Sequence, residues 1–127
     1  MPDVLELVIP AESAELRELR RQVDMWAGPF LPEDAREDLK LAITEACANS
    51  VLHSGTEEIR VSMRVIGACV EAIIADDGIY RELLRVDDDA DAHRGLALMA
   101  ALVDHLTLHR GTASEIGTTV SMRKCLA

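Results

Sequence analysis

The sequence predicts an α+β fold in which a single-layer mixed or antiparallel β-sheet carries its helices on one face. Two observations support this prediction. Strand-like segments occur in adjacent pairs, and helical segments separate these pairs along the chain. The 127 residues are 49% hydrophobic, which suffices for one buried core. Because the chain contains no repeat, low-complexity tract or linker, we expect one domain over residues 1–127.

One strand and two helices are expected in the N-terminal half. Apolar and polar residues alternate over 4–9, and the proline that follows ends this strand. Ser13 is expected to cap a helix over 14–27, in which large apolar residues recur at helical spacing. Pro32 opens a second helix with an acidic first turn, and this helix continues to about His53.

The C-terminal half is expected to supply four strands and one helix. The strands are residues 58–65, 69–76, 104–110 and 117–124. The strand over 69–76 is almost entirely apolar, so we expect it to be central in the sheet. The acidic segment 78–92 is predicted to be a loop, and a short apolar helix is predicted over 94–103.

The chain is strongly acidic, with a formal net charge of -10 at pH 7 and a pI near 4.7. A surface of this charge repels a phosphate backbone, so we expect no direct binding to nucleic acid. It would attract a protein partner with a basic face. Acidic residues near the N-terminus and short apolar stretches argue against a signal peptide and a membrane span, which predicts a cytoplasmic protein.

The cysteines lie far apart and lack the spacing of metal ligands. They are Cys47, Cys69 and Cys125. We expect reduced thiols at all three positions, and neither a disulfide framework nor a zinc site.

A polar stripe on the second helix is the most informative candidate site. Glu45, Asn49 and His53 are four residues apart in succession, so they share one helix face. Their neighbours are small or apolar, which indicates a buried helix, and polar groups on such a helix need partners. By spacing alone, the stripe could simply face solvent or a loop. Alternatively, it forms the wall of a site, with Asn49 offering an oxygen to a cation and Glu45 acting as a base.

A second candidate lies where the apolar strand over 69–76 ends in Asp-Asp-Gly. This sequence fixes the carboxylate of Asp76 at the strand end, with the permissive Gly78 two residues later. Taken alone, the Asp-Gly sequence at residues 77 and 78 is typical of a turn.

Two weaker candidates follow in the chain. Arg94, Gly95 and Leu96 precede an apolar run, where the backbone amides of a helix N-terminus and a guanidinium could bind an anion. A plain helix start is the alternative. Thr118 follows a glycine at the start of the last strand and offers a hydroxyl.

In this order, the motifs resemble the four motifs of the histidine-kinase-like (GHKL, Bergerat-fold) ATPases. They read Glu-x-x-x-Asn, Asp-x-Gly, Arg-Gly-Leu and Gly-Thr. The stretch from Leu41 to His53 resembles the anti-sigma-factor serine-protein kinases of the RsbW type in particular. The resemblance covers nearly the whole chain. It implies a Bergerat ATP-binding fold, with ATP and Mg²⁺ bound.

The resemblance also implies a role for each motif residue. Glu45 would be the general base that takes the proton from a serine or threonine of a partner, and Asn49 would bind Mg²⁺. Asp76 would accept a hydrogen bond from the amino group of adenine, helped by the hydroxyl of Thr118. The other ATP-binding residues would be Gly78 beside the base and Arg94, Gly95 and Leu96 beside the phosphates, with a lid over 80–91.

The implied function is that of a regulator that phosphorylates an anti-anti-sigma (STAS-type) protein, sequesters a sigma factor and forms homodimers. The chain departs from the family pattern at Tyr80 and His93, which replace motif glycines, and at Ala97, where glycine is frequent. One alternative is therefore a partner-switching binding module with weak or no ATP turnover. Another is an unrelated α+β domain whose motifs coincide. A sensor kinase is disfavoured because the chain has no dimerisation helix with a phosphoacceptor histidine.

Overall fold

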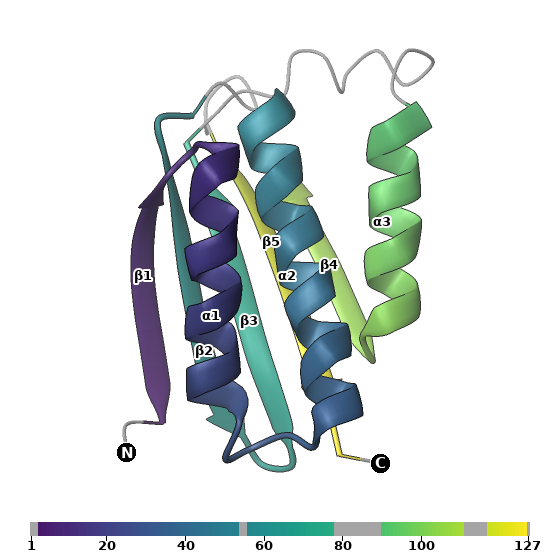
Figure 1. Ribbon diagram of the computed structural model, residues 1–127. Coiled ribbons are helices and arrows are strands. Elements are labelled where there is room, and N and C mark those ends of the chain that lie inside the picture. Colours follow the sequence, from purple (N-terminus) through teal and green to yellow (C-terminus); the bar gives the residue numbers. More distant parts are fainter. Residues whose placement is uncertain (1–2, 54–55, 78–89, 111–116, 127) are drawn as a thin grey trace.

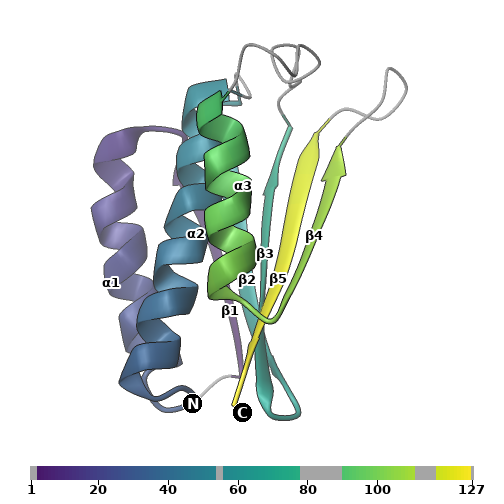
Figure 2. The same cartoon turned by 90° about the vertical axis from the view of Figure 1, so that its right-hand side faces the viewer.

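Helices and strands form two layers, as seen in a computed structural model that describes residues 3–53, 56–77, 90–110 and 117–126 (Figures 1 and 2). The helices of the described residues are α1 (Leu16–Ala27), α2 (Glu33–His53) and α3 (Ala90–Leu102), with a 3-10 turn, η1 (Ser13–Glu15), before α1. The strands are β1 (Val4–Pro10), β2 (Glu58–Ile66), β3 (Cys69–Asp76), β4 (His105–Arg110) and β5 (Thr118–Cys125). All three helices lie on the same face of the sheet (Figure 2).

The sheet has the strand order β1-β2-β3-β5-β4, and every neighbouring pair is antiparallel. The predicted α+β class is therefore confirmed, and the sheet is antiparallel throughout its described strands. The strand expected to be central, β3, lies in the middle. Its apolar side chains explain this position, because Val70, Ala72 and Ile74 are all buried beneath the helices.

The core fills the space between the two layers. Its helix residues include Leu19 and Val23 of α1, Ile43 of α2 and Met99 of α3, all of which are at most 1% exposed. The sheet contributes alternate residues from its inner face, which are Ile59, Val61, Met63, Val70, Ala72, Ile74, Val120 and Met122. Burying each of the larger aliphatic side chains contributes ~1.5–3 kcal/mol, and this term holds the helices on the sheet.

Two predicted helix starts differ from the structure. Helix α1 begins at Leu16 after η1, and its N-cap Glu15 makes no side-chain capping bond, so the capping role expected of Ser13 is wrong. Helix α3 begins at Ala90, four residues before the expected start at Arg94. The residues between them extend the helix because alanine favours it and an aspartate suits its first turn.

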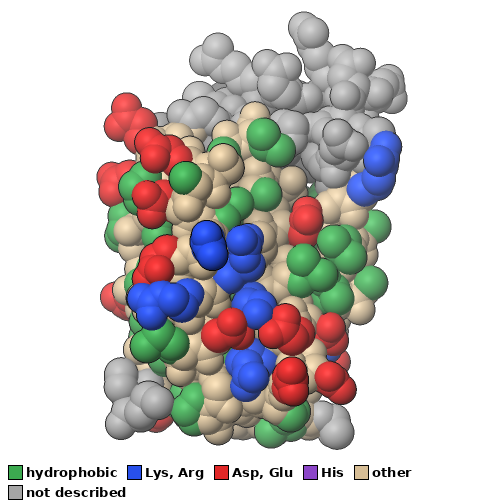
Figure 3. All heavy atoms as spheres, in the orientation of Figure 1, with side chains coloured by type: hydrophobic (Ala, Val, Ile, Leu, Met, Phe, Trp, Pro, Cys, Tyr) green, Lys and Arg blue, Asp and Glu red, His purple; other side chains and the backbone are tan. Residues whose placement is uncertain are grey.

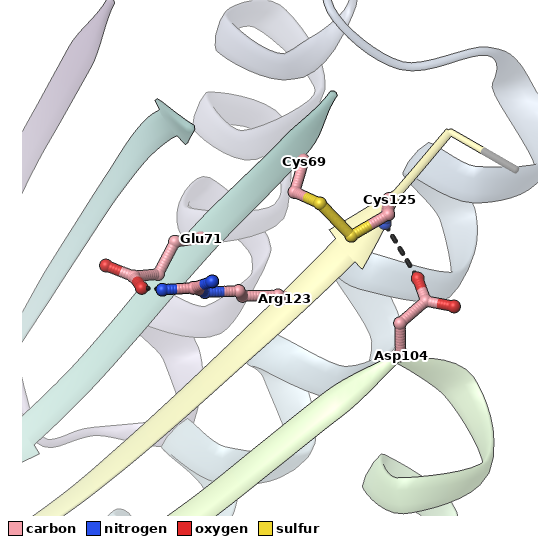
Figure 4. Close-up of a disulfide and its surroundings, with 5 residues drawn as sticks. All are labelled: Cys69, Glu71, Asp104, Arg123 and Cys125. Atoms are coloured by element: carbon pink, nitrogen blue, oxygen red, sulfur yellow. Dashed lines mark hydrogen bonds and ion pairs between the residues drawn. A yellow bond between two sulfur atoms is a disulfide. The ribbon is translucent and has the colours of Figure 1, made fainter. Parts of the chain in front are cut away.

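A disulfide joins Cys69 of β3 to Cys125 of β5 (Figure 4). The two residues are direct partners in the β3–β5 register, with Cα atoms 3.9 Å apart, and the expectation of reduced thiols is wrong for this pair. The backbone amide of Cys125 also donates a 2.7 Å hydrogen bond to Oδ2 of Asp104. Cys47 is free and buried, and burial together with the negative charge of Asp76 raises the pKa of its thiol to about 12.

No helix of the described residues covers the outer face of the sheet (Figure 2). Near the middle of this face, Glu71 accepts hydrogen bonds from Arg64 at 2.8 Å and from Arg123 at 3.1 Å. The Glu71 side chain is only 6% exposed, so the two guanidinium groups neutralise a carboxylate that is largely removed from water.

Within the parts of the chain that the structure describes, no helix is long and apolar enough to cross a membrane.

Candidate functional site

Glu45 and Asn49 lie on the same side of α2, and both face α3. At Gly95 of α3, a Cβ atom would lie 3.1 Å from Nδ2 of Asn49 and 3.4 Å from Oε2 of Glu45. Both polar side chains are half-buried. The structure therefore brings together the predicted base, the predicted metal ligand and a glycine of the third motif.

The glycine allows α2 and α3 to approach closely at this point. Gly95 is itself buried and belongs to the interior of α3, because that helix begins at Ala90. The amide of a residue inside a helix donates to a carbonyl four residues earlier, so the amide of Gly95 is not at a helix N-terminus. The expected anion site made by a helix start at Gly95 is therefore wrong in this detail.

The flanking residues of the third motif take different positions. The Arg94 side chain is exposed, whereas Leu96 is partly buried and packs against the hydrophobic core. Leu96 therefore helps to anchor α3 on the sheet. Ala97 is exposed on the same helix.

Asp76 forms a second cluster at the end of β3. It is only 3% exposed, and the hydroxyl of Ser50 on α2 donates a hydrogen bond to its Oδ2 atom over 2.6 Å. Thr118 of β5 is its direct partner in the β3–β5 register and is 4% exposed. A carboxylate and two hydroxyl-bearing residues are therefore gathered at one end of the sheet, beneath α2.

Gly117 lies directly against the backbone of Asp76 at this end of the sheet. Its φ is 118°, in the region that favours glycine, and a Cβ there would lie 2.7 Å from the carbonyl oxygen of Asp76. Any side chain at this position would force β5 away from β3. The glycine therefore keeps Thr118 next to Asp76.

The two clusters meet on α2, because Asn49 belongs to the first and the adjacent Ser50 belongs to the second. Sequence reasoning missed Ser50 and assigned no role to Gly117 beyond a strand start. A signal for Ser50 was present, since a hydroxyl on an almost wholly apolar helix needs a buried partner. The partner itself is 26 residues away and could not be identified from spacing.

Asp77, which follows the buried aspartate, has a different role. Arg60 forms a two-pronged ion pair with it, with distances of 3.0 and 3.1 Å, and this hydrogen bonding lowers the pKa of the Asp77 carboxyl. Both side chains are more than half exposed, so the pair contributes little to stability. It lies next to the end of β3, where Asp76 is buried.

Several predicted features lie outside the described residues. They are Gly78, Tyr80 and the lid segment up to residue 89. The backbone of His93 belongs to α3, but its side chain also lies outside the described part.

The residues of the first cluster fit a magnesium ion that arrives with a phosphate ligand. Among the described residues, no group of three or more histidine, cysteine, aspartate or glutamate side chains could hold a metal by itself. Mg²⁺ is commonly bound by one or two protein oxygens together with water and substrate phosphates. The carboxamide oxygen of Asn49, which stands beside Gly95, is a suitable single protein ligand.

A family model described as "Histidine kinase-like ATPase domain" matches residues 9–124, which is nearly the whole chain. The chain belongs to the histidine kinase-like ATPase family. The resemblance inferred from the four motifs is thereby confirmed, and the antiparallel sheet with helices on one face agrees with this fold.

This member of the histidine kinase-like ATPase family is also similar to proteins named as serine-protein kinases. It is 31% identical to "Serine-protein kinase RsbW" of Bacillus velezensis over an alignment of 142 positions, which covers 98% of this chain and 86% of the relative. The protein of the same name from Bacillus licheniformis is 34% identical with the same coverage. The Staphylococcus aureus protein is 24% identical, with 96% of this chain covered.

Proposed function

We propose that this chain is an ATP-dependent serine/threonine kinase and anti-sigma regulator. It would phosphorylate a serine or threonine of an anti-anti-sigma (STAS-type) protein and sequester a sigma factor. One observation carries the proposal: Glu45 and Asn49 point to the same side of α2, against Gly95. The chain's similarity to serine-protein kinases supports a hydroxyl group as the phosphoryl acceptor.

In this proposal the second cluster binds the nucleobase. Asp76 accepts a hydrogen bond from the amino group of adenine, and Thr118 assists through its hydroxyl. The proposal also assigns Gly78 to contact with the base, and Arg94, Gly95 and Leu96 to contact with the phosphates. The burial of Asp76 and Thr118 supports this assignment, because a hydrogen bond to a base is stronger where water is excluded.

The first cluster carries the chemistry. Asn49 holds Mg²⁺, which offsets the charge of the triphosphate when it is bound. Glu45 would accept the proton of the partner's hydroxyl group as that oxygen attacks the γ-phosphorus, while the bond from this phosphorus to the β–γ bridging oxygen breaks and ADP leaves. The half-buried position of Glu45 next to α3 suits this role, since the carboxylate is reachable by a substrate and is partly shielded from water.

The surface of the helix layer supports binding to a protein partner. A groove of about 490 Å³ on α1 and α2 is lined by Arg17, Arg20, Arg21 and Lys40 among acidic residues (Figure 3). Basic side chains therefore gather on one face of a chain whose net charge is -10. Such mixed charge favours selective docking of a protein over binding to nucleic acid.

The alternative is a binding module that exchanges partners without phosphoryl transfer. The specific observation in its favour is the replacement of two motif glycines by Tyr80 and His93. Both readings require binding to the same partners, so phosphorylation itself must be measured.

The decisive experiment incubates the purified protein with radiolabelled ATP, Mg²⁺ and a candidate STAS-type protein. Transfer of label to serine or threonine of the candidate is expected. Binding without any transfer, to each STAS-type protein that forms a complex, would favour the binding module.

Metal-dependent nucleotide binding is tested separately with Asn49→Ala. The wild type should gain thermal stability from Mg²⁺-ATP, and this gain should shrink when EDTA removes the metal. Asn49→Ala should respond equally with and without Mg²⁺. Gln22→Ala, which removes an amide from α1, is the matched control and should behave like the wild type. Tight Mg²⁺-dependent binding by Asn49→Ala would contradict the metal role.

A further inference from the structure

The contact between Ser50 and Asp76 joins two layers of the fold at the proposed base-binding cluster. Ser50 lies on α2 and Asp76 ends β3, and the two residues are 4% and 3% exposed. Their hydrogen bond has a length of 2.6 Å between Oγ and Oδ2, which is typical of a hydroxyl that donates to a charged carboxylate.

We propose that Ser50 is a positioning residue that makes the site selective for purines carrying a 6-amino group. It would act through Asp76. Its hydrogen bond would hold the carboxylate in one orientation and would keep it a hydrogen-bond acceptor. The inference rests on the proposed function, because it assumes that Asp76 contacts the base of ATP. It adds a specificity determinant outside the four motifs.

The Asp76 carboxylate is held in one orientation by its neighbours. The terminal torsion of aspartate is broad, so a carboxylate at a strand end can rotate unless a neighbour holds it. The β3–β5 register and the close approach of Gly117 fix the backbone of Asp76. The hydrogen bond from Ser50 then fixes one carboxylate oxygen, and with it the plane of the group.

The protonation state of Asp76 decides from which groups it can accept a hydrogen bond. Burial disfavours an ionised carboxylate, whereas a hydrogen bond donated to its charged form favours it. Because the Ser50 hydroxyl donates, it supports an Asp76 that only accepts hydrogen bonds. Such a group pairs with the 6-amino group of adenine, but it opposes the 6-oxo group of guanine, which is also an acceptor.

The position of Ser50 also excludes a simple space-filling explanation for its hydroxyl. The inward-facing neighbours on this helix, Ala46 and Cys47, pack within the core without a polar partner among the described hydrogen bonds. An alanine would be as compatible with that packing and with helix formation. The hydroxyl at position 50 therefore serves the carboxylate that it contacts.

The test compares three nucleotides with the full chain in the presence of Mg²⁺. They are ATP, GTP and the triphosphate of purine riboside, which lacks the 6-amino group. Isothermal titration calorimetry measures each dissociation constant for the wild type, Ser50→Ala, Ser50→Thr and Asp76→Asn. Ser62→Ala, on the outer face of β2, is the matched control.

We expect Ser50→Ala to weaken ATP binding about ten-fold, as the loss of a hydrogen bond to a charged group predicts. Binding of purine riboside triphosphate should change by no more than about two-fold, because that ligand offers no amino group to Asp76. The preference for ATP over GTP should fall as well. Ser50→Thr retains the hydroxyl and should restore the preference, and Ser62→Ala should match the wild type.

A double variant measures whether the two residues act together. Adding Ser50→Ala to Asp76→Asn should produce no further loss of ATP affinity, because the hydroxyl acts through the carboxylate. Independent losses that add together would overturn the proposal.

Other outcomes separate this inference from the proposed function. Equal weakening of ATP and purine riboside triphosphate by Ser50→Ala would indicate a purely structural role and overturn the inference. If Ser50→Ala keeps the full preference for ATP while Asp76→Asn loses it, the inference is also overturned. The proposed function would stand in that case. A wild-type protein that bound no nucleotide would overturn both.

Discussion

Gly95 of α3 lies so close to Asn49 of α2 that a Cβ on residue 95 would be 3.1 Å from Nδ2 of Asn49. The same atom would be 3.4 Å from Oε2 of Glu45. Nδ2 of Asn49, the proposed metal ligand, would have to yield by a few tenths of an ångström, whereas Oε2 of Glu45, the proposed base, would be in ordinary van der Waals contact. Because residue 95 of α3 has no side chain, the Glu45 and Asn49 side chains of α2 have room beside it.

Gly95→Ala should weaken nucleotide binding without lowering the stability of the fold. Alanine inside a helix is favoured over glycine by about 1 kcal/mol, so the free energy of unfolding should stay level or rise. The new methyl group should displace Asn49 and weaken Mg²⁺-ATP binding by about ten-fold, or ~1.4 kcal/mol. Calorimetric titration and chemical denaturation measure the two quantities. Ala100→Gly, at an exposed site of α3, should lower stability by about 1 kcal/mol and leave ATP affinity unchanged.

Glu45→Gln should bind ATP but fail to transfer phosphate. Glutamine keeps the size of the side chain and removes the base, so transfer should fall at least about 100-fold while ATP affinity stays within about two-fold. Phosphoserine and phosphothreonine on the partner protein are measured with radiolabelled ATP. Glu33→Gln, in the exposed first turn of α2, should retain normal transfer. Undiminished phosphorylation by Glu45→Gln would refute the role of the base.

Reduction of the Cys69–Cys125 disulfide should lower the free energy of unfolding. The bond closes a loop with a sequence separation of 56, for which loss of loop-closure entropy predicts up to ~4 kcal/mol. Urea denaturation with and without dithiothreitol measures this difference. Cys47→Ala keeps the pair and should remain sensitive to reductant, whereas Cys69→Ser should be insensitive. Identical unfolding curves for the wild type in both conditions would show that the bond does not form in solution.

Glu71 should make stability depend on pH in the acid range. Burial alone would raise the pKa of its carboxyl, but hydrogen bonds from Arg64 and Arg123 outweigh it and hold the pKa below the ordinary value of 4.5. A carboxylate with a lowered folded-state pKa stabilises the protein above its unfolded-state pKa. That contribution disappears as the pH falls through the folded-state value.

Stability should therefore decrease as the pH is lowered below about 4.5, and Glu71→Gln should flatten this decrease. At neutral pH, Glu71→Gln should cost about 1–3 kcal/mol, because hydrogen bonds to a charged group are lost. Denaturation measured across the acid range checks both effects. Glu6→Gln, at an exposed site of β1, is the control and should follow the wild type. An unchanged acid slope in Glu71→Gln would exclude this carboxylate as the source.

Most of the fold could be predicted because its signals are local. The alternation over β1 and the apolar run of β3 gave strands within one residue of their observed bounds. The spacing of Glu45 and Asn49 predicted their shared face for the same reason, since a helix repeats every 3.6 residues. The predicted start of α3 at Arg94 is too late because the first turn of the helix, from Ala90, carries no apolar stripe.

The features that were missed depend on contacts between distant residues. The pairing of Cys69 with Cys125 follows from the register of two strands, and cysteine spacing contains no information about that register. The hydrogen bond from Ser50 to Asp76 likewise depends on how α2 crosses the sheet. Local patterns predicted the motif residues, whereas the packing revealed the residues that contact them.

The disulfide and the Asp76–Thr118 pair stand at opposite ends of one ladder between β3 and β5. Sliding β5 by a single residue would reverse the direction of all its side chains and turn the Thr118 hydroxyl out of the interior. The sulfur bridge forbids that slide. A covalent anchor near the C-terminus thus sets the alignment on which the proposed recognition of adenine at the far end would depend.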